Sequence, residues 1–286
     1  MKTKIYLLNT ENIKDPKCYD SWKRFLPKDR WEKTVRPIKE EDRKMELAVW
    51  LLLYYALKEW GIPSDEINEE GAYCYGEHGK PMRKKKDIYF NLSHSGNYVL
   101  CVLASEEIGC DIEKIREVKW KLAKRFFSEK EYDILEHLKE NNKNDREDGE
   151  NIANRPAKID AINESGAINE RKQSVEVNAQ NKSAEKNIVD EDSENRITAE
   201  EMFTRFWTLR ESYVKKTGEG LGTALKGLDF SDVLVQMHSK RKKNGEFLTE
   251  NFFEIEYDGY HIAVCGEKTS EPEFIVCGSA IDNCFL

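Results

Sequence analysis

The sequence predicts an α+β protein that is built from two similar halves. Segments 50–61 and 207–218 have the pattern of amphipathic helices, align with each other without gaps, and each end in a glycine. Segments 98–104 and 260–266 are rich in β-branched and apolar residues, as strands are. The same elements recur in the same order, which is typical of a tandem duplication.

The two predicted halves are an N-terminal half, 1–105, and a C-terminal half, 106–286. We expect antiparallel sheets in both, a pseudo-twofold axis that relates them, and a ligand site in the cleft between them. Tyr54 in the first helical segment corresponds to Glu211 in the second. Only one half offers a carboxylate at this position, so the site should be unsymmetrical.

The composition is that of a globular chain. With 286 residues, 39% of them hydrophobic, the protein can bury a core. The longest apolar run, 47–57, is shorter than the roughly 18–20 residues that cross a bilayer, and no signal-peptide cleavage site is visible. The seven cysteines are scattered and never spaced as Cys-x-x-Cys, which argues against a disulfide framework and a zinc site. We therefore expect a cytoplasmic protein with reduced thiols.

The charge balance also limits the kinds of partner. The 54 acidic and 46 basic residues give a net charge of −8, which argues against bulk binding of nucleic acid. A local basic cluster such as 83–86 can still hold phosphates. We expect a monomer with neither a nucleic acid nor a membrane as its partner.

Segment 141–198 differs in composition from the rest of the chain. Asn, Glu, Lys, Asp and Ser dominate it, and no aromatic residue occurs between Tyr132 and Phe203. Such a segment buries too little apolar surface to fold by itself. We interpret it as a solvated insertion in a surface loop that interrupts the second half.

Asp111 and Glu113 are the first candidate site residues. They are two apart in a segment with strand character, so their side chains point to the same face. Neighbouring carboxylates repel each other unless a cation lies between them, and oxygen ligands of this kind favour magnesium or manganese. A solvated strand face is the alternative interpretation.

Glu211 and Lys215 are four apart in the second helical segment, hence on one face of the helix. Apolar and aromatic residues surround them in the sequence, which favours a partly buried charged pair over a surface ion pair. Such a pair needs a compensating partner.

Two further segments carry groups that suit anions. Segment 91–96 reads Asn-Leu-Ser-His-Ser-Gly and follows a predicted strand at 87–90, so it offers hydroxyls, an imidazole and a flexible glycine to a phosphate. Segment 79–81 reads Gly-Lys-Pro, a rigid turn that carries the cation of Lys80.

Taken together and in this order, these segments resemble the 4'-phosphopantetheinyl transferases, in particular the surfactin-type branch with two tandem halves. The resemblance covers residues 30–221 apart from the insertion. Five ordered motifs are far more specific than any one of them. The motifs lie at 79–81, 90–96, 108–113, 124–132 and 207–221.

The resemblance implies an enzyme of the holo-[carrier-protein] synthase type. It transfers the 4'-phosphopantetheine arm of coenzyme A to a serine hydroxyl of an acyl or peptidyl carrier protein and releases 3',5'-ADP. Asp111, Glu113 and Glu211 would be the ligands of Mg²⁺, with Mn²⁺ as a possible substitute. Either Glu211 or a metal-bound water would accept the serine proton, and Lys215 would neutralise the phosphates.

The resemblance also implies contacts to the nucleotide. His94, together with Ser93, would contact the 3'-phosphate of coenzyme A, and Lys80 with its turn would flank the nucleotide. Lys44 follows Arg43 at a position where the family usually has an Arg followed by a hydroxyl residue. A lysine holds a phosphate as a point charge without bidentate geometry, so this contact would be weaker or shifted.

Arg30 and Lys33 are further basic candidates for contacts to coenzyme A. In segment 118–127 we expect an amphipathic helix, with Phe126 and Phe127 in the core and its lysines facing an acidic carrier protein. The alternative function is a non-catalytic paralogue that binds coenzyme A or the carrier protein. A metal-dependent phosphohydrolase is a second alternative. The complete set of three carboxylates favours the enzyme over a binder.

Overall fold

The computed structural model describes eight stretches of the chain: 2–13, 22–34, 39–147, 197–220, 228–231, 246–248, 251–267 and 272–277. The predicted α+β class is confirmed, because these stretches form helices together with largely antiparallel sheets. In this part of the chain no helix combines the length and the apolar character that crossing a membrane requires.

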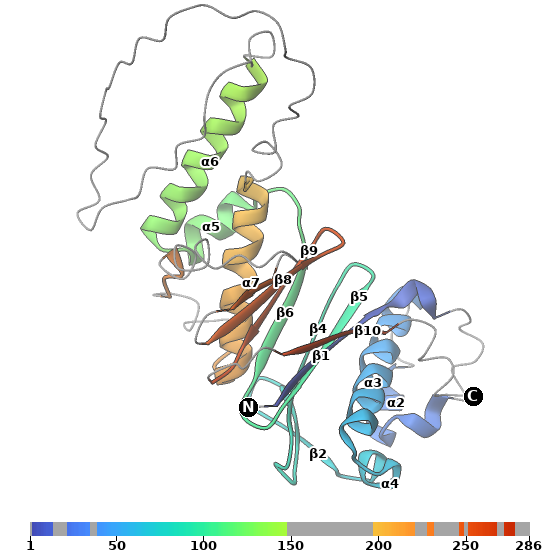
Figure 1. Ribbon diagram of the computed structural model, residues 1–286. Helices are drawn as coiled ribbons and strands as arrows, with labels where there is room; N and C mark the ends of the chain where they lie inside the picture. Colours follow the sequence, from blue (N-terminus) through green and yellow to red (C-terminus); the bar gives the residue numbers. More distant parts are fainter. Residues whose placement is uncertain are drawn as a thin grey trace, which may run out of the picture.

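Two four-stranded sheets form the centre of the molecule (Figure 1). The first has the order β10-β1-β5-β4 and the second the order β6-β9-β8-β7. The predicted antiparallel pairing is confirmed for all neighbouring strands in them except β1 and β10, which are parallel. The strands are β1 (Thr3–Asn9), β4 (Tyr89–Ser95), β5 (Tyr98–Ala104), β6 (Gly109–Lys114), β7 (Glu246–Leu248), β8 (Phe252–Tyr257), β9 (Tyr260–Cys265) and β10 (Glu273–Cys277). A short ribbon of β2 (Tyr73–Tyr75) and β3 (Pro81–Arg83) stands beside them.

Each sheet is accompanied by one long helix, α3 (Glu40–Trp60) or α7 (Ala199–Thr217). Both helices end at a glycine in the left-handed region, Gly61 at φ 108° and Gly218 at φ 75°, as the sequence predicts. A capping box of Thr198 and Glu201 starts α7. A third long helix is α6 (Glu129–Glu147), and the shorter helices are α2 (Lys28–Thr34), α4 (Ser64–Asn68) and α5 (Trp120–Phe126).

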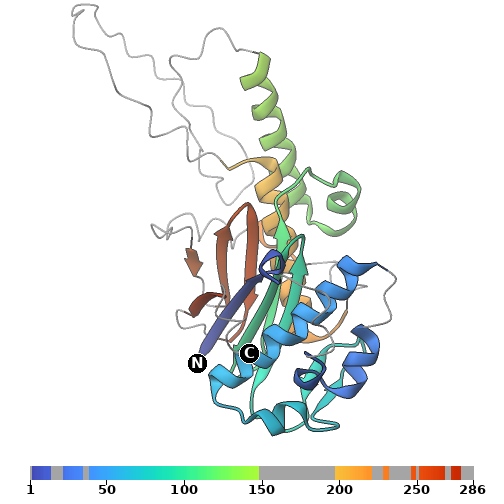
Figure 2. The ribbon, with the colours of Figure 1, turned by 90° about the vertical axis from the view of Figure 1, so that its right-hand side faces the viewer.

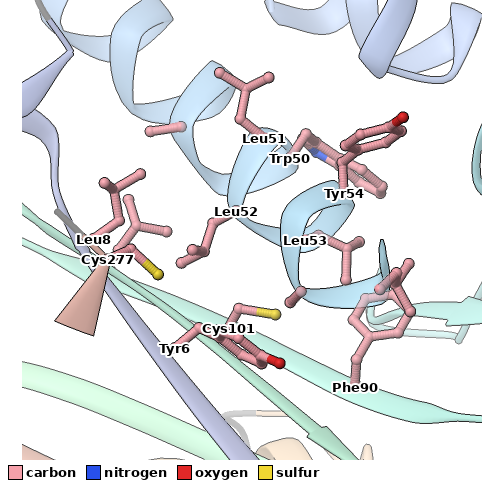
Figure 3. Packing of buried hydrophobic residues seen from close by; sticks show 14 of the residues in the cluster. Tyr6, Leu8, Trp50, Leu51, Leu52, Leu53, Tyr54, Phe90, Cys101 and Cys277 are labelled. Carbon is pink, nitrogen blue, oxygen red and sulfur yellow. The ribbon is translucent and has the colours of Figure 1, made fainter. Parts of the chain in front are cut away.

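The layers follow the order helix, sheet, sheet, helix (Figures 1 and 2). Alternation along β5 explains this order, because Cys101 and Leu103 face α3 while Leu100 and Val102 face the second sheet. Figure 3 shows Leu52 of α3 pointing toward the first sheet. The opposite face of the second sheet packs against α7.

The helices α5 and α6 pack on the outer side of α7. Phe127 lies against Phe203 and Phe206 of α7, with ring centroids 5.4 and 5.6 Å apart, and Phe126 lies 6.0 Å from Trp207. Both Phe126 and Phe127 are half-buried rather than fully enclosed. The exposed side of α5 carries lysines, Lys121 and Lys124.

The predicted strand at 87–90 differs in extent from the observed one. β4 begins at Tyr89 and continues through His94 to Ser95, because every residue of this stretch pairs with β5. The predicted anion-binding segment 91–96 is therefore mostly strand. Its Gly96, at φ 54°, allows close packing, because a Cβ there would lie 2.2 Å from the hydroxyl of Tyr260.

The polar insertion predicted at 141–198 falls largely outside the described residues. Its first residues, 141–147, continue helix α6, and Ile197 and Thr198 lead into α7. Residues 148–196 are not among those described.

Candidate active site

The edges of the two sheets meet where β4 runs beside β6. Residues 91, 93 and 95 alternate along β4 and point to β6. The side-chain oxygen of Asn91 accepts a hydrogen bond from the backbone N–H of Cys110 at 2.9 Å, and the Ser95 hydroxyl accepts one from the N–H of Lys114 at 3.2 Å. Side chains of β4 thus satisfy backbone groups at the open edge of β6.

The same strand positions two acids. Asp111 and Glu113 alternate with the core residues Cys110 and Ile112, so they point away from the core between the sheets and toward α7. Ser93 donates its hydroxyl to Asp111 Oδ1 at 2.8 Å, and Ser95 donates to Glu113 Oε2 at 3.1 Å. Hydroxyl donors therefore fix the orientation of both carboxylates.

Helix α7 brings Lys215 to these acids. Its ammonium lies 2.6 Å from Asp111 Oδ1 and 3.0 Å from the Ser93 hydroxyl, although 104 residues separate Lys215 from Asp111. The sequence predicts a charged pair of Glu211 and Lys215, whereas the close ion pair of Lys215 is with Asp111.

One cavity of about 340 Å³ joins these groups. A smaller cavity of about 110 Å³ lies next to it and shares Glu113 and Trp207 with it. Of the predicted site residues, six line the larger cavity. Its lining is Leu92, Ser93, His94, Asp111, Glu113, Trp207, Glu211 and Lys215.

The negative charge in this cavity is only partly compensated. Burial, and then the charge of Asp111, raise the pKa of Glu211 from 4.5 to about 7. The same two causes raise the pKa of Glu113. Burial favours the neutral amine of Lys215, but the charge of Asp111, its hydrogen bond and the other acidic groups nearby together outweigh burial and raise the pKa of this lysine. The site therefore holds a carboxyl that can bind or release a proton near neutral pH.

His94 stands at the exposed rim of the cavity. Desolvation of the ring, followed by the charge of Lys215, lowers the pKa of His94. Near neutral pH the ring therefore favours the uncharged form.

The donor set suits a divalent cation. Asp111 Oδ2 is buried and accepts no hydrogen bond from the residues that the structure describes, and carboxylate oxygens are the ligands that magnesium prefers. Among the residues that the structure describes, no three His, Cys, Asp or Glu side chains cluster closely enough to hold an ion as they stand. The Lys215 ammonium beside Asp111 Oδ1 takes the position of a counter-charge, so a cation would have to displace it.

Comparisons with known proteins point to one family. Residues 170–265 match the model of the 4'-phosphopantetheinyl transferase superfamily. The 4'-phosphopantetheinyl transferase gsp of Aneurinibacillus migulanus is 33% identical over 117 residues, which are 41% of this chain and 47% of gsp. Sfp of Bacillus subtilis strain 168 is 34% identical over 113 residues, which are 39% of this chain and 49% of Sfp. These matches support the 4'-phosphopantetheinyl transferase family that the sequence motifs predict.

The similarity to Sfp and gsp agrees with the surfactin-type branch that the sequence motifs predict. The matched segments span slightly less than half the length of these two members of the superfamily. A third, the 4'-phosphopantetheinyl transferase ffp of Bacillus subtilis, is 22% identical over 280 residues, which are 95% of this chain and 96% of ffp.

Two other predicted site residues, Lys80 and Lys44, lie outside the lining of the cavity. The ammonium of Lys80 lies 3.3 Å from the carbonyl oxygen of Ile108 and 3.2 Å from that of Lys216, so it links the β2–β3 region to the C-terminal end of α7. Lys44 is half-buried on α3, away from the lining.

Arg30 and Lys33 belong to α2. The guanidinium of Arg30 lies between two aromatic rings, 4.7 Å from the centroid of Trp50 and 4.2 Å from that of Tyr75, and donates to the Tyr75 hydroxyl at 2.6 Å. The side chain of Lys33 lies outside the described part of the structure.

Three residues of the site received no role from the sequence: Asn91, Ser95 and Trp207. A signal for the first two was present, because 91, 93 and 95 are polar residues at the two-residue spacing of a strand face. The predicted strand ends at residue 90 instead, before this spacing begins. Trp207 lies one helical turn before Glu211, which is the signal that places both on the same cavity.

Proposed function

We propose that the protein transfers the 4'-phosphopantetheine arm of coenzyme A to a serine hydroxyl of an acyl or peptidyl carrier protein and releases 3',5'-ADP. The observation that carries the proposal is the convergence of Asp111, Glu113 and Glu211 on one cavity with Lys215 and His94. The names of gsp and Sfp describe 4'-phosphopantetheinyl transferases, which supports the same activity here.

The proposed divalent cation is Mg²⁺, with Mn²⁺ as its substitute, and its proposed ligands are Asp111, Glu113 and Glu211. When bound, such an ion supplies positive charge that stabilises the charge developing on phosphate oxygens during transfer. The uncompensated negative charge of the cavity and the unbonded Asp111 Oδ2 support this assignment.

Glu211 is the proposed acceptor of the serine proton. Its raised pKa of about 7 matches the requirement that a general base be partly ionised near the working pH. A carboxylate oxygen of Glu211 would take the hydroxyl proton as the serine oxygen attacks the β-phosphorus of coenzyme A. The pair of electrons of the broken phosphorus–oxygen bond then leaves with 3',5'-ADP.

Lys215 and the Ser93–His94 pair are the proposed phosphate contacts. The ammonium of Lys215, released from Asp111, would donate to oxygens of the diphosphate and neutralise the leaving group. The neutral ring of His94 at the rim, with the Ser93 hydroxyl, would donate to the 3'-phosphate. The more peripheral proposed contacts to coenzyme A are Lys80, Lys44, Arg30 and Lys33.

The architecture supports a wider proposal. Each sheet with its long helix has the same order of main elements along the chain: a strand, the helix and a hairpin. They are β1-α3-β4-β5 in the first and β6-α7-β8-β9 in the second. We therefore propose that 1–105 and 106–286 are duplicated halves related by a pseudo-twofold axis, with the site in the cleft between them. We further propose a cytoplasmic monomer whose exposed lysines on α5 meet an acidic carrier protein, without a membrane or nucleic-acid partner.

The test is the direct assay. The purified chain is incubated with MgCl₂, coenzyme A and a panel of apo carrier domains, and the carriers are examined by intact mass, with Glu211→Gln as the control. The expected result is a mass gain of one phosphopantetheine that disappears in the variant. Saturable binding of coenzyme A without any mass gain would contradict the proposal and favour a binding paralogue.

A further inference from the structure

Four polar side chains are fully buried between α7 and the second sheet. They are Arg205 and Thr208 of α7, Glu254 of β8 and His261 of β9, each with at most 1% of its surface exposed. The Arg205 guanidinium faces both oxygens of Glu254, at 3.3 Å from Nε and 3.2 Å from Nη2. His261 Nε2 lies 2.9 Å from Glu254 Oε1. The four groups form one continuous chain of contacts.

Thr208 of α7 is the last residue in this series of contacts. Its hydroxyl oxygen lies 2.7 Å from His261 Nδ1 and 3.1 Å from the carbonyl oxygen of Arg205, one turn earlier in the helix. The helix backbone is thereby tied to a side chain of β9. A buried hydroxyl with two partners has little freedom to move.

The chain of contacts lies directly beside the proposed metal site. In the β6–β9 ladder His261 stands opposite Glu113, and opposite residues of antiparallel strands point to the same face. Thr208 precedes Glu211 by three residues and Lys215 by seven, so these side chains follow one another along the same side of α7. A shift of α7 along the sheet would separate Glu211 from Glu113 and Asp111.

The energetics of these buried groups favour a role in positioning α7 over a role in stabilising the fold. Burial raises the pKa of Glu254, but the Arg205 guanidinium and the contact with His261 together outweigh it and hold this pKa low, so the carboxylate stays ionised inside the protein. A buried ion pair of this kind contributes little net stability compared with apolar side chains, because desolvation of the charges cancels most of their attraction. Its contacts are satisfied in only one placement of the helix over the sheet.

We propose that Arg205, Thr208, Glu254 and His261 are positioning residues that fix the register of α7 over β8 and β9 and thereby bring Glu211 to Asp111 and Glu113. This inference rests on the proposed metal site. None of the four residues lines the cavity, so their effect on the cation passes through α7.

The test measures binding of Mn²⁺ by electron paramagnetic resonance, without substrate. Thr208→Val removes the hydroxyl at nearly constant volume, and the double variant Arg205→Met with Glu254→Leu removes both charges together. Groups that orient metal ligands affect the affinity by roughly tenfold or more, so we expect the Kd for Mn²⁺ to rise about tenfold in both. Thr208→Ser, which keeps the hydroxyl, should restore binding to within about twofold of the wild type.

A second buried ion pair provides the matched control. Arg210 of α7 pairs with Glu131 of α6, and both are fully buried, but they face away from β6 and β9 toward the carbonyl of Leu228 and the N–H of Phe230. We expect Arg210→Met with Glu131→Leu to bind Mn²⁺ like the wild type, with all titrations run where circular dichroism shows the variant folded.

The possible failures are distinguishable. If the wild type binds no Mn²⁺, the proposed metal site is wrong and the inference falls with it. If the wild type binds but Thr208→Val and the Arg205 double variant bind equally well, the metal site stands and the positioning role is overturned. An equal loss in the Arg210 control would also overturn it, because the effect would then reflect general loosening of α7.

Discussion

At the scale of single residues, Glu211 couples the charge of the site to the stability of the fold. Its pKa is raised to about 7, above the ordinary 4.5, so the folded chain binds this proton more tightly than the unfolded chain. Stability from this source is complete below pH 4.5 and is lost as the pH rises through 7. The expected loss is at most about 3 kcal/mol.

Glu211→Gln should remove this dependence. In protein freed of divalent cations, the variant should match the wild type near pH 4.5 and exceed its free energy of unfolding at pH 8, as measured by urea titration at both pH values. Asp133→Asn removes an exposed carboxylate of α6 and is the control. If the difference in free energy of unfolding between the wild type and Glu211→Gln were the same at pH 8 as at pH 4.5, the raised pKa of Glu211 would not be the cause of the pH dependence.

Lys215 is the second residue whose role can be isolated. Its ammonium lies 2.6 Å from Asp111 Oδ1 with 30% of the side chain exposed, so it competes with a cation for the same oxygen. A partly exposed ion pair is worth up to about 1 kcal/mol, so Lys215→Met should bind Mg²⁺ up to about fivefold more tightly in calorimetry while losing turnover. Lys58→Met, at an exposed position of α3, makes the same change of net charge and should alter neither. Unchanged or weaker Mg²⁺ binding in Lys215→Met would show that the lysine does not compete.

At the scale of elements, the approach of α7 to β6 depends on Gly109. A Cβ at this position would lie 2.0 Å from the carbonyl oxygen of Ser212 and 2.4 Å from the N–H nitrogen of Lys216, both in the helix backbone. We expect Gly109→Ala to lower the free energy of unfolding by about 3 kcal/mol, because backbone cannot move aside as a side chain can. At Gly76 the nearest atom to an added Cβ is 3.8 Å away, so Gly76→Ala is the control. Equal stability of the two variants in denaturant titrations would refute this account.

The elements themselves differ in how far the sequence predicts them. The helices that end at Gly61 and Gly218 and the strands β5 and β9 follow from local periodicity and capping, which neighbouring residues determine. The extension of β4 through His94 does not, because its polar residues are held in the strand by pairing with β5 and by contacts to β6.

The site shows the same division between local and distant causes. The placement of Asp111 and Glu113 on one strand face follows from a two-residue spacing. The partner of Lys215 does not follow from its position four residues after Glu211, because Asp111 reaches it through the packing of α7 on β6. Likewise, the burial of Glu254 and His261 depends on which face of the second sheet α7 covers.

At the scale of the whole molecule, the two sheets share one apolar core. It is formed by alternate residues of β1 and β5 on one side and of β6, β8 and β9 on the other, and Leu100 at its centre is completely buried. The strand β10 also connects the two sheets, because it follows β9 of the second sheet in the chain but pairs with β1 of the first sheet. The structure therefore predicts that the two sheets unfold together.

Leu100→Ala tests this coupling. The substitution opens a cavity between the sheets and should lower the free energy of unfolding by about 3 kcal/mol. Because the core is shared, Trp50 on α3 and Trp207 on α7 should report the same midpoint when each is observed in a variant that lacks the other five of the six tryptophans. Circular dichroism should coincide with both. Two separate midpoints would mean that each sheet with its helix is stable alone, and would contradict the shared core as the cause of cooperative unfolding.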